Sequence, residues 1–118
     1  MACELVDLDR LGTKMKIIFV RHGDPDYCEL EEYSYTGFGL DLAPLSEKGR
    51  RQAQELCQNP LLGSADILVS SAVTRALETA SYVVRATGLP LRVEPLLHEW
   101  QVYETGIENF EKARTLQY

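Results

Sequence analysis

The sequence predicts a single α/β domain built on a mostly parallel sheet. Three runs rich in branched apolar residues, at 17–20, 66–70 and 91–94, alternate with stretches of helical apolar spacing at 47–58 and 73–87. Strands that alternate with helices pair in parallel, so the loops that follow them open on one edge of the sheet. With 118 residues, 45% hydrophobic and 25% charged, the chain suits one small globular domain.

The first predicted strand, 16–20, contains a continuous apolar run, which favours burial on both faces. Met15 directly precedes it, and the residues before Met15 differ in composition. We therefore expect residues 1–14 to be an N-terminal extension outside the fold and residues 15–118 to form the domain. The stretch 24–44 combines glycines, prolines and aromatics, which is typical of a long functional loop or lid.

The predicted helices have identifiable ends. Ser46 is expected to be the N-cap of the helix over 47–58. Ser71 is expected to cap the next helix, and Gly88 has the position of the glycine that closes it. A last helix is expected over about 107–116, where apolar residues recur at helical spacing.

Composition excludes several classes of partner. With 12 Lys and Arg against 18 Asp and Glu, the net charge is −6, which disfavours non-specific nucleic-acid binding but permits a local basic pocket for a small anion. Apolar runs are too short to span a membrane, and we expect no membrane partner. The cysteines, Cys3, Cys28 and Cys57, have no metal-binding spacing, so we expect a reducing cytoplasm and no structural zinc.

Charged and nucleophilic residues follow two of the predicted strands. Arg21, His22 and Gly23 come directly after the first strand, and Arg75 lies just after the end of the second. Arginine forks bind phosphate oxygens in pairs, and a glycine lets the backbone approach an anion closely. An imidazole between them can attack phosphorus and form a phosphoramidate. The joint placement predicts a phosphoryl site, although each residue alone also has an ordinary structural explanation.

Two other interpretations rest on the first long loop. His22, Asp24 and Asp26 supply an imidazole and carboxylates at close spacing, as Mg²⁺ or Mn²⁺ hydrolase sites do. This metal interpretation lacks a second cluster of ligands. Gly37 and Gly39 form a fragment of a nucleotide-binding motif without the rest of its glycine pattern. We expect no metal and no cofactor.

Four blocks of sequence resemble a known family in their order. IIFVRHGDPDY (17–27), PLSEKGRRQAQEL (44–56), ILVSSAVTRALETA (67–80) and LRVEPLLHEW (91–100) are similar to successive blocks of the histidine phosphatase superfamily, phosphoglycerate mutase-like branch. The likeness extends from residue 16 to about 105 and is greatest to small bacterial phosphatases. It implies a three-layer α/β/α fold with a mostly parallel sheet.

The resemblance also implies roles for single residues. His22 would be the nucleophile that accepts the phosphoryl group, and Glu99 the general acid that protonates the leaving oxygen. An asparagine that many relatives carry shortly after Arg-His-Gly is absent here. The substrate phosphate would be held by Arg21, Gly23, Thr36, Gly37 and Arg75.

One departure from the family concerns a second histidine on a later strand. The only other histidine is His98, next to Glu99, in a different context. The chain therefore resembles the N-terminal half of a phosphatase, truncated to about three strands. We expect open strand edges, self-association through such an edge, and weak or no turnover.

The function expected from these observations is phosphomonoester hydrolysis through a phosphohistidine on His22, independent of metal. Its substrate would be a small phosphorylated metabolite or a phosphoprotein. An alternative is a non-catalytic module that binds a phosphorylated ligand with the same residues. A third is an unstable fragment without a function of its own, which would behave as a molten state.

Overall fold

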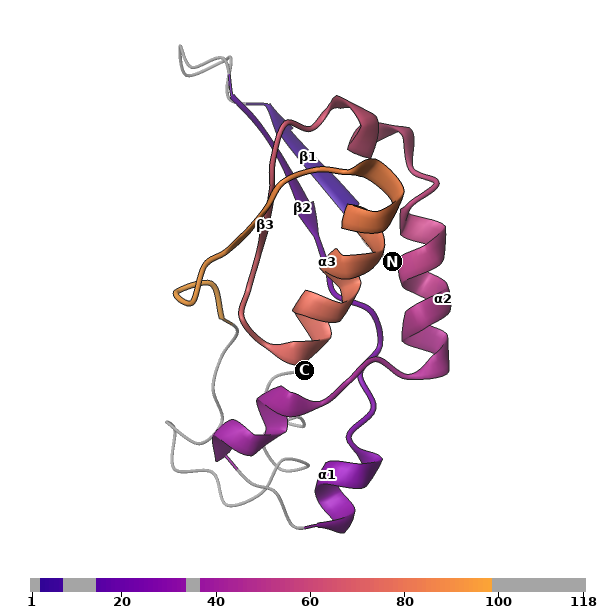
Figure 1. Cartoon of the computed structure of the whole chain (residues 1–118), viewed down its shortest axis with the longest axis vertical. Coiled ribbons are helices and arrows are strands. Elements are labelled where there is room, and N and C mark those ends of the chain that lie inside the picture. Colours follow the sequence, from indigo (N-terminus) through magenta and orange to yellow (C-terminus); the bar gives the residue numbers. More distant parts are fainter. Residues whose placement is uncertain (1–2, 8–14, 34–36, 99–118) are drawn as a thin grey trace.

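The computed structural model describes residues 3–7, 15–33 and 37–98 (Figure 1). This part contains both helices and strands, and its last three elements are a strand, a helix and a strand, which confirms the predicted α/β class. The elements in chain order are β1 (Cys3–Asp7), β2 (Lys16–Val20), α1 (Cys28–Glu32), the 3₁₀ helix η2 (Gly37–Leu42), α2 (Glu47–Leu56), the 3₁₀ helix η3 (Pro60–Ser64), β3 (Leu68–Ser70), α3 (Thr74–Thr87) and β4 (Leu91–Val93).

The strands of the described part form two pairs. β3 and β4 are parallel, with Ser70 opposite Val93, and α3 makes the crossover between them, as the sequence predicts. β1 and β2 are antiparallel, with Cys3 opposite Val20. β2 therefore takes its partner from the chain before it, and its C-terminal end still leads directly into Arg21 and His22.

The expectation that residues 1–14 lie outside the fold is corrected for Cys3–Asp7, which form β1. A strand edge carries unpaired N–H and C=O groups, and β1 lies along one edge of β2 over all five of its residues. Cys3 also packs against the hydrophobic core. The composition of this segment, which contains acidic residues, does not predict a strand. Strand pairing depends on backbone hydrogen bonds as well as on the side chains.

The core lies between the strands and the two long helices. Leu56 of α2, Leu62 of η3 and Val83 of α3 form its buried centre. The half-buried residues Cys3, Val20, Cys57 and Leu68 pack around them. Figure 1 shows α2 and α3 side by side, with α1 at the far end of the molecule. The predicted apolar faces of both helices are thus the faces that meet.

Two of the three predicted helix ends are confirmed. Ser46 is the N-cap of α2, and its hydroxyl accepts a hydrogen bond from the N–H of Gly49 at 3.1 Å. Gly88 ends α3 with φ of 71°, in the left-handed region that favours glycine. The prediction for Ser71 is wrong, because the N-cap of α3 is Val73. The Ser71 hydroxyl instead accepts from the Val73 N–H at 3.4 Å, in a turn just before the helix.

The expected long loop 24–44 contains two short helices, α1 and η2. Its two ends meet, since the N–H of Asp26 donates to the carbonyl of Pro44 at 2.8 Å. The helix expected over 107–116 lies outside the described residues. Within them, no helix combines the length and apolar character that a membrane span requires.

Candidate functional site

His22 and Arg75 meet where the sequence predicts that two strand ends converge. His22 follows β2 and is half-buried, whereas Arg75 lies in the first turn of α3 and is only 6% exposed. The Nε–H of Arg75 donates to Nε2 of His22 at 3.3 Å. A guanidinium thus lies directly beside the imidazole nitrogen, as binding and transfer of a phosphoryl group would require.

The partners of the His22 ring define which nitrogen carries the proton. Nδ1 lies 2.7 Å from the carbonyl oxygen of Gly23, which only accepts hydrogen bonds. Nε2 faces the Nε–H of Arg75, which only donates. This hydrogen-bond pattern assigns the proton to Nδ1 and a lone pair to Nε2. Nε2 is therefore the atom of this ring that is able to act as a nucleophile.

Asp41 of η2 is a second partner of Arg75. Its Oδ1 lies 3.5 Å from Nη1, and the two side chains are 27% and 8% exposed. A buried guanidinium needs an opposite charge, and this carboxylate supplies one from the long loop. Sequence reasoning missed Asp41, because one acidic residue in a loop has no periodicity that would link it to a distant arginine.

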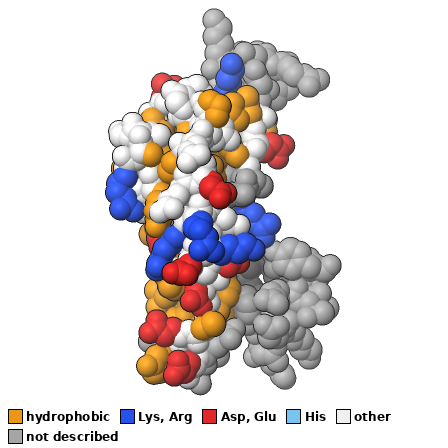
Figure 2. All heavy atoms as spheres, turned by 90° about the vertical axis from the view of Figure 1, so that its right-hand side faces the viewer, with side chains coloured by type: hydrophobic (Ala, Val, Ile, Leu, Met, Phe, Trp, Pro, Cys, Tyr) orange, Lys and Arg blue, Asp and Glu red, His pale blue; other side chains and the backbone are white. Residues whose placement is uncertain are grey.

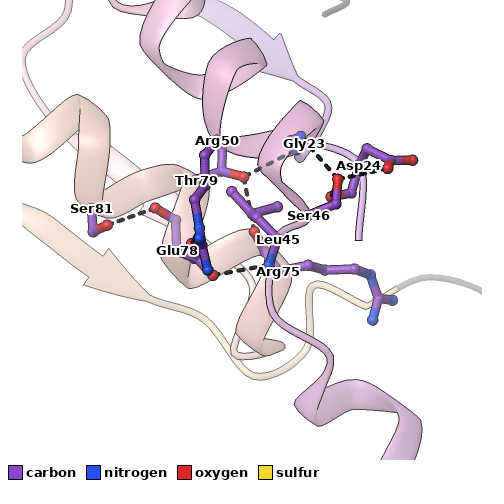
Figure 3. A network of polar contacts seen from close by, with 10 residues as sticks. Gly23, Asp24, Leu45, Ser46, Arg50, Arg75, Glu78, Thr79 and Ser81 are labelled. Carbon is purple, nitrogen blue, oxygen red and sulfur yellow. Dashed lines mark hydrogen bonds and ion pairs between the residues drawn. The ribbon is translucent and has the colours of Figure 1, made fainter. Parts of the chain in front are cut away.

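Thr79 joins α3 to the loop of residues 21–24, which follows β2 and carries His22. Its hydroxyl oxygen accepts a hydrogen bond from the N–H of Gly23 at 3.0 Å. The same hydroxyl donates to the carbonyl of Arg75 at 2.8 Å. Figure 3 shows Thr79 among the polar contacts of α3. Sequence reasoning missed this residue, although its position one helical turn after Arg75 places both on the same face of α3.

The N-terminus of α2 holds the other side of the loop. The N–H of Asp24 donates to Oε1 of Gln52 at 2.9 Å. The Ser46 hydroxyl donates to Oδ2 of Asp24 at 2.7 Å, and the Ser46 N–H donates to the Asp24 carbonyl at 2.9 Å (Figure 3). A Cβ on Gly49 would lie 2.2 Å from that carbonyl oxygen, so the helix approaches the loop closely only because this residue is glycine.

Glu78 connects α3 to the segment before α2. Its carboxylate accepts a hydrogen bond from the Leu45 N–H at 2.9 Å. Its other oxygen lies 3.4 Å from Nε of Arg50. Leu45 is almost completely buried, at 1% exposure, so its N–H needs a partner within the protein. Glu78 thus helps to hold α2 against the helix that carries Arg75.

The two carboxylates that the metal interpretation invokes, Asp24 and Asp26, accept hydrogen bonds from neighbouring groups of the protein. Asp24 accepts from Ser46, and Oδ1 of Asp26 accepts from the N–H of Cys28 at 2.9 Å. The pKa of Asp26 lies below its usual value because this backbone N–H stabilises the carboxylate. Among the residues that the structure describes, no group of three or more His, Cys, Asp or Glu side chains is arranged to hold a metal ion.

The remaining predicted site residues divide into two groups. Arg21 is exposed and follows β2 directly, and Gly37 is the first residue of η2, the element that carries Asp41. Thr36 and Glu99 lie outside the described residues. His98, the second histidine of the chain, is exposed in the segment after β4.

Positive charge collects near the site although the chain is acidic overall. Figure 2 shows Lys and Arg side chains in a band across the middle of one face of the molecule. The first half of α2 carries exposed Lys48, Arg50 and Arg51. Such a local concentration of positive charge attracts anions in spite of a net charge of −6.

Comparisons with known proteins agree with this geometry. A family model described as histidine phosphatase superfamily (branch 1) matches residues 17–115. A mycobacterial glucosyl-3-phosphoglycerate phosphatase, solved with VO3, is 38% identical with a TM-score of 0.52, over 67% of this chain and 36% of that one. The native structure of the same phosphatase is 32% identical with a TM-score of 0.51, over 79% of this chain and 47% of that one.

A proposed alpha-ribazole-5'-P phosphatase from Escherichia coli is 30% identical with a TM-score of 0.55, over 70% of this chain and 40% of that one. The chain thus spans less than half the length of the protein chain in each of these three structures. A search of curated proteins found no match.

Proposed function

Because the chain belongs to the histidine phosphatase superfamily, branch 1, we propose that it transfers the phosphoryl group of a phosphomonoester to His22 and then to water. The observation that carries the proposal is the state of His22. Its Nε2 bears the ring's lone pair, which accepts a hydrogen bond at 3.3 Å from the Nε–H of the nearly buried Arg75. A nucleophile beside a phosphate-binding cation is the minimum that this reaction requires.

The proposed reaction has two steps. In the first, Nε2 of His22 forms a bond to phosphorus while the ester P–O bond breaks. The leaving oxygen takes a proton from Glu99, the general acid that the family resemblance implies. In the second, a water oxygen attacks phosphorus, the N–P bond breaks, and the water proton passes to Glu99. No metal ion takes part in either step.

Gly23 and Arg75 assist the first step in different ways. The phosphorylated imidazole carries a positive charge, and the carbonyl of Gly23 stabilises it by accepting from Nδ1–H. The Nε–H of Arg75 now faces the lone pair of Nε2. When a phosphate binds, this N–H donates to a phosphoryl oxygen instead, which frees the lone pair for attack.

The substrate class proposed is a small phosphorylated metabolite or a phosphoprotein. The relatives are phosphatases for small phosphate esters by name, which favours a metabolite. The exposed cations of α2 would attract such a dianion toward the site. The same charge would act on a phosphopeptide, so substrate profiling with both classes is needed to separate them.

We propose slow turnover for this chain by itself. The family resemblance implies a second histidine beside the phosphoryl group, and the only other histidine, His98, is exposed after β4. Loss of one preorganised donor typically costs about 100-fold to 1,000-fold in rate. The chain also covers only 36% to 47% of the relatives' length.

A second candidate function is binding of a phosphorylated ligand without turnover. It is favoured by the same absence of a second histidine in a strand-end position, since Arg75 and His22 alone provide for binding. Hydrolysis of an aryl phosphate in EDTA, beside His22→Ala, tests the first proposal. Activity that resists EDTA and disappears in His22→Ala supports phosphatase function. Equal rates in both proteins, with phosphate binding retained, would leave the binding module.

Self-association and a cytoplasmic location are further proposals. Several large apolar side chains on the strands are more than 40% exposed, namely Phe19, Val69, Leu91 and Val93. Such exposure favours contact with another apolar surface. The cysteines of the chain are free, which suits a reducing compartment. Light scattering after size-exclusion chromatography tests the first proposal, and a monomer at every concentration would contradict it.

A further inference from the structure

Two peptide groups flank Gly23, and each is held by a side chain from a different helix. The N–H of Gly23, in the peptide that follows His22, donates to Oγ1 of Thr79 on α3 at 3.0 Å. The next peptide has its N–H at Asp24, which donates to Oε1 of Gln52 on α2 at 2.9 Å. The carbonyl of this second peptide is the one that accepts from Nδ1 of His22.

The contact with Gln52 determines where that carbonyl points. In a trans peptide the N–H and the C=O point in opposite directions. Holding the Asp24 N–H on Gln52 therefore directs the Gly23 oxygen toward the other side, where Nδ1 of His22 lies 2.7 Å away. Glycine has the widest backbone freedom of any residue, so Gly23 needs an external constraint at this point.

The contact with Thr79 fixes the peptide between His22 and Gly23. Thr79 is 5% exposed, and its hydroxyl proton goes to the carbonyl of Arg75 at 2.8 Å. The oxygen lone pairs are then left for the Gly23 N–H. One hydroxyl thus joins the peptide after His22 to the backbone of the arginine that contacts Nε2.

We infer that Gln52 and Thr79 are positioning residues that maintain the reactive tautomer of His22. They orient the two peptides around Gly23, so that its carbonyl keeps the proton on Nδ1 and leaves the lone pair on Nε2. Thr79 and Gln52 act through the backbone on either side of Gly23, to which their side chains are hydrogen-bonded. The inference rests on the proposed function for its purpose, but the tautomer itself is measurable without any substrate.

Nitrogen-15 NMR of the imidazole reports the tautomer directly. The chain has two histidines, so the variant His98→Gln leaves His22 as the only signal. In this background, Gln52→Leu and Thr79→Val each remove one contact at similar side-chain volume. Gln52→Glu and Thr79→Ser are the matched controls, because they retain the acceptor oxygen and the hydroxyl.

We expect the Nδ1-protonated form to predominate in the parent and in both controls, at a pH where the ring is neutral. In Gln52→Leu and Thr79→Val the Nε2-protonated form should gain by about fivefold, the effect of one hydrogen bond of ordinary strength. The rate of phosphohistidine formation should fall by a similar factor with little change in KM. Thr79→Ser and Gln52→Glu should keep both the tautomer and the rate of the parent.

Retention of the Nδ1 proton in both Gln52→Leu and Thr79→Val would overturn the inference, whatever the activity. If Thr79→Val does not fold, the half-buried Gln52→Leu decides the matter by itself. Absence of phosphatase activity in the parent protein would contradict the proposed function and leave the tautomer result intact. The two failures are therefore distinguishable.

Discussion

Arg75 and His22 are 53 residues apart in the sequence, yet the Nε atom of Arg75 lies 3.3 Å from Nε2 of His22. The contact brings a permanent positive charge to the ring nitrogen that bears the lone pair. It depends on one helix and one strand end, because Arg75 lies in the first turn of α3 and His22 follows β2. The stability of these elements is therefore directly linked to the chemistry of the site.

Replacement of Arg75 should abolish most of the phosphoryl transfer to His22. Arg75→Ala is expected to slow phosphohistidine formation by about 100-fold or more, as for loss of one strong preorganised donor. Arg75→Lys should not restore the rate, because an ammonium cannot reproduce the planar fork that contacts both His22 and Asp41. Rapid-quench assays measure both rates, and a wild-type rate in the lysine variant would contradict the account.

Removal of the Asp41 carboxylate should make the position of the Arg75 side chain less fixed, while the guanidinium keeps its positive charge. Asp41→Asn keeps a hydrogen-bond acceptor of the same size but loses the ion pair at 3.5 Å. We expect a moderate fall in kcat, of about threefold to tenfold, the range of a partly exposed charge-assisted hydrogen bond. Steady-state kinetics on an aryl phosphate test this expectation, with Asp66→Asn, an exposed aspartate outside the network, as the control. Equal kinetics in both variants would show that Asp41 has no part in the site.

Gly49→Ala should destabilise the protein strongly. The new Cβ would lie 2.2 Å from the carbonyl oxygen of Asp24, which is backbone and cannot rotate away. A cost of about 1–3 kcal/mol or more in the free energy of unfolding is expected from overpacking. The matched control is Gly63→Ala, where nothing lies within 4 Å of the new Cβ. Urea unfolding compares the two, and equal midpoints would refute the close approach of α2 to the loop.

Ser46→Ala tests the cap that supports the same contact. Its hydroxyl accepts from the Gly49 N–H and donates to the Asp24 carboxylate, so alanine removes both interactions. Loss of an N-cap costs about 1 kcal/mol, and the lost partner of Asp24 adds to it. Ser64→Ala, which removes one exposed hydroxyl contact to Leu61, should cost less. Thermal unfolding followed by circular dichroism ranks the two variants.

Asp26 should contribute a small pH dependence to stability. Its pKa is lowered in the folded state by the hydrogen bond from the Cys28 N–H. A depressed carboxyl pKa stabilises the fold above the unfolded value of about 3.9, and this stabilisation disappears as the pH falls through the folded value. Asp26→Asn should remove that dependence. The difference in unfolding free energy between the two proteins should thus shrink on acidification, and a constant difference would contradict the assignment.

The sequence predicts that His22 and Arg75 lie close together, because both follow predicted strands whose ends are expected at one sheet edge. The two residues do meet, although β2 pairs with β1 and β3 with β4 in separate sheets. The sequence also predicts the caps at Ser46 and Gly88 for a local reason, because the chemistry of each residue favours the backbone geometry of a helix end. Ser71 shows the limit of such local rules, because its hydroxyl serves the turn before α3 instead of the helix. The parts determined locally are thus mostly predictable.

The remaining parts depend on contacts between distant segments. β1 forms because the edge of β2 needs a partner, and nothing in residues 3–7 alone identifies that partner. Side-chain contacts across 34, 28 and 56 residues bring Asp41, Gln52 and Thr79 into the site. No periodicity within a short segment records such contacts, so sequence reasoning finds the nucleophile and the cation but not the residues that orient them.

Transfer of a phosphoryl group to His22 is the central claim, and mass spectrometry of the protein after brief exposure to an aryl phosphate in EDTA tests it most directly. The account predicts one acid-labile phosphate per chain, mapped to His22, present in His98→Gln and absent in His22→Ala. An unmodified His22 in a folded protein, or a phosphate retained in His22→Ala, would contradict the account.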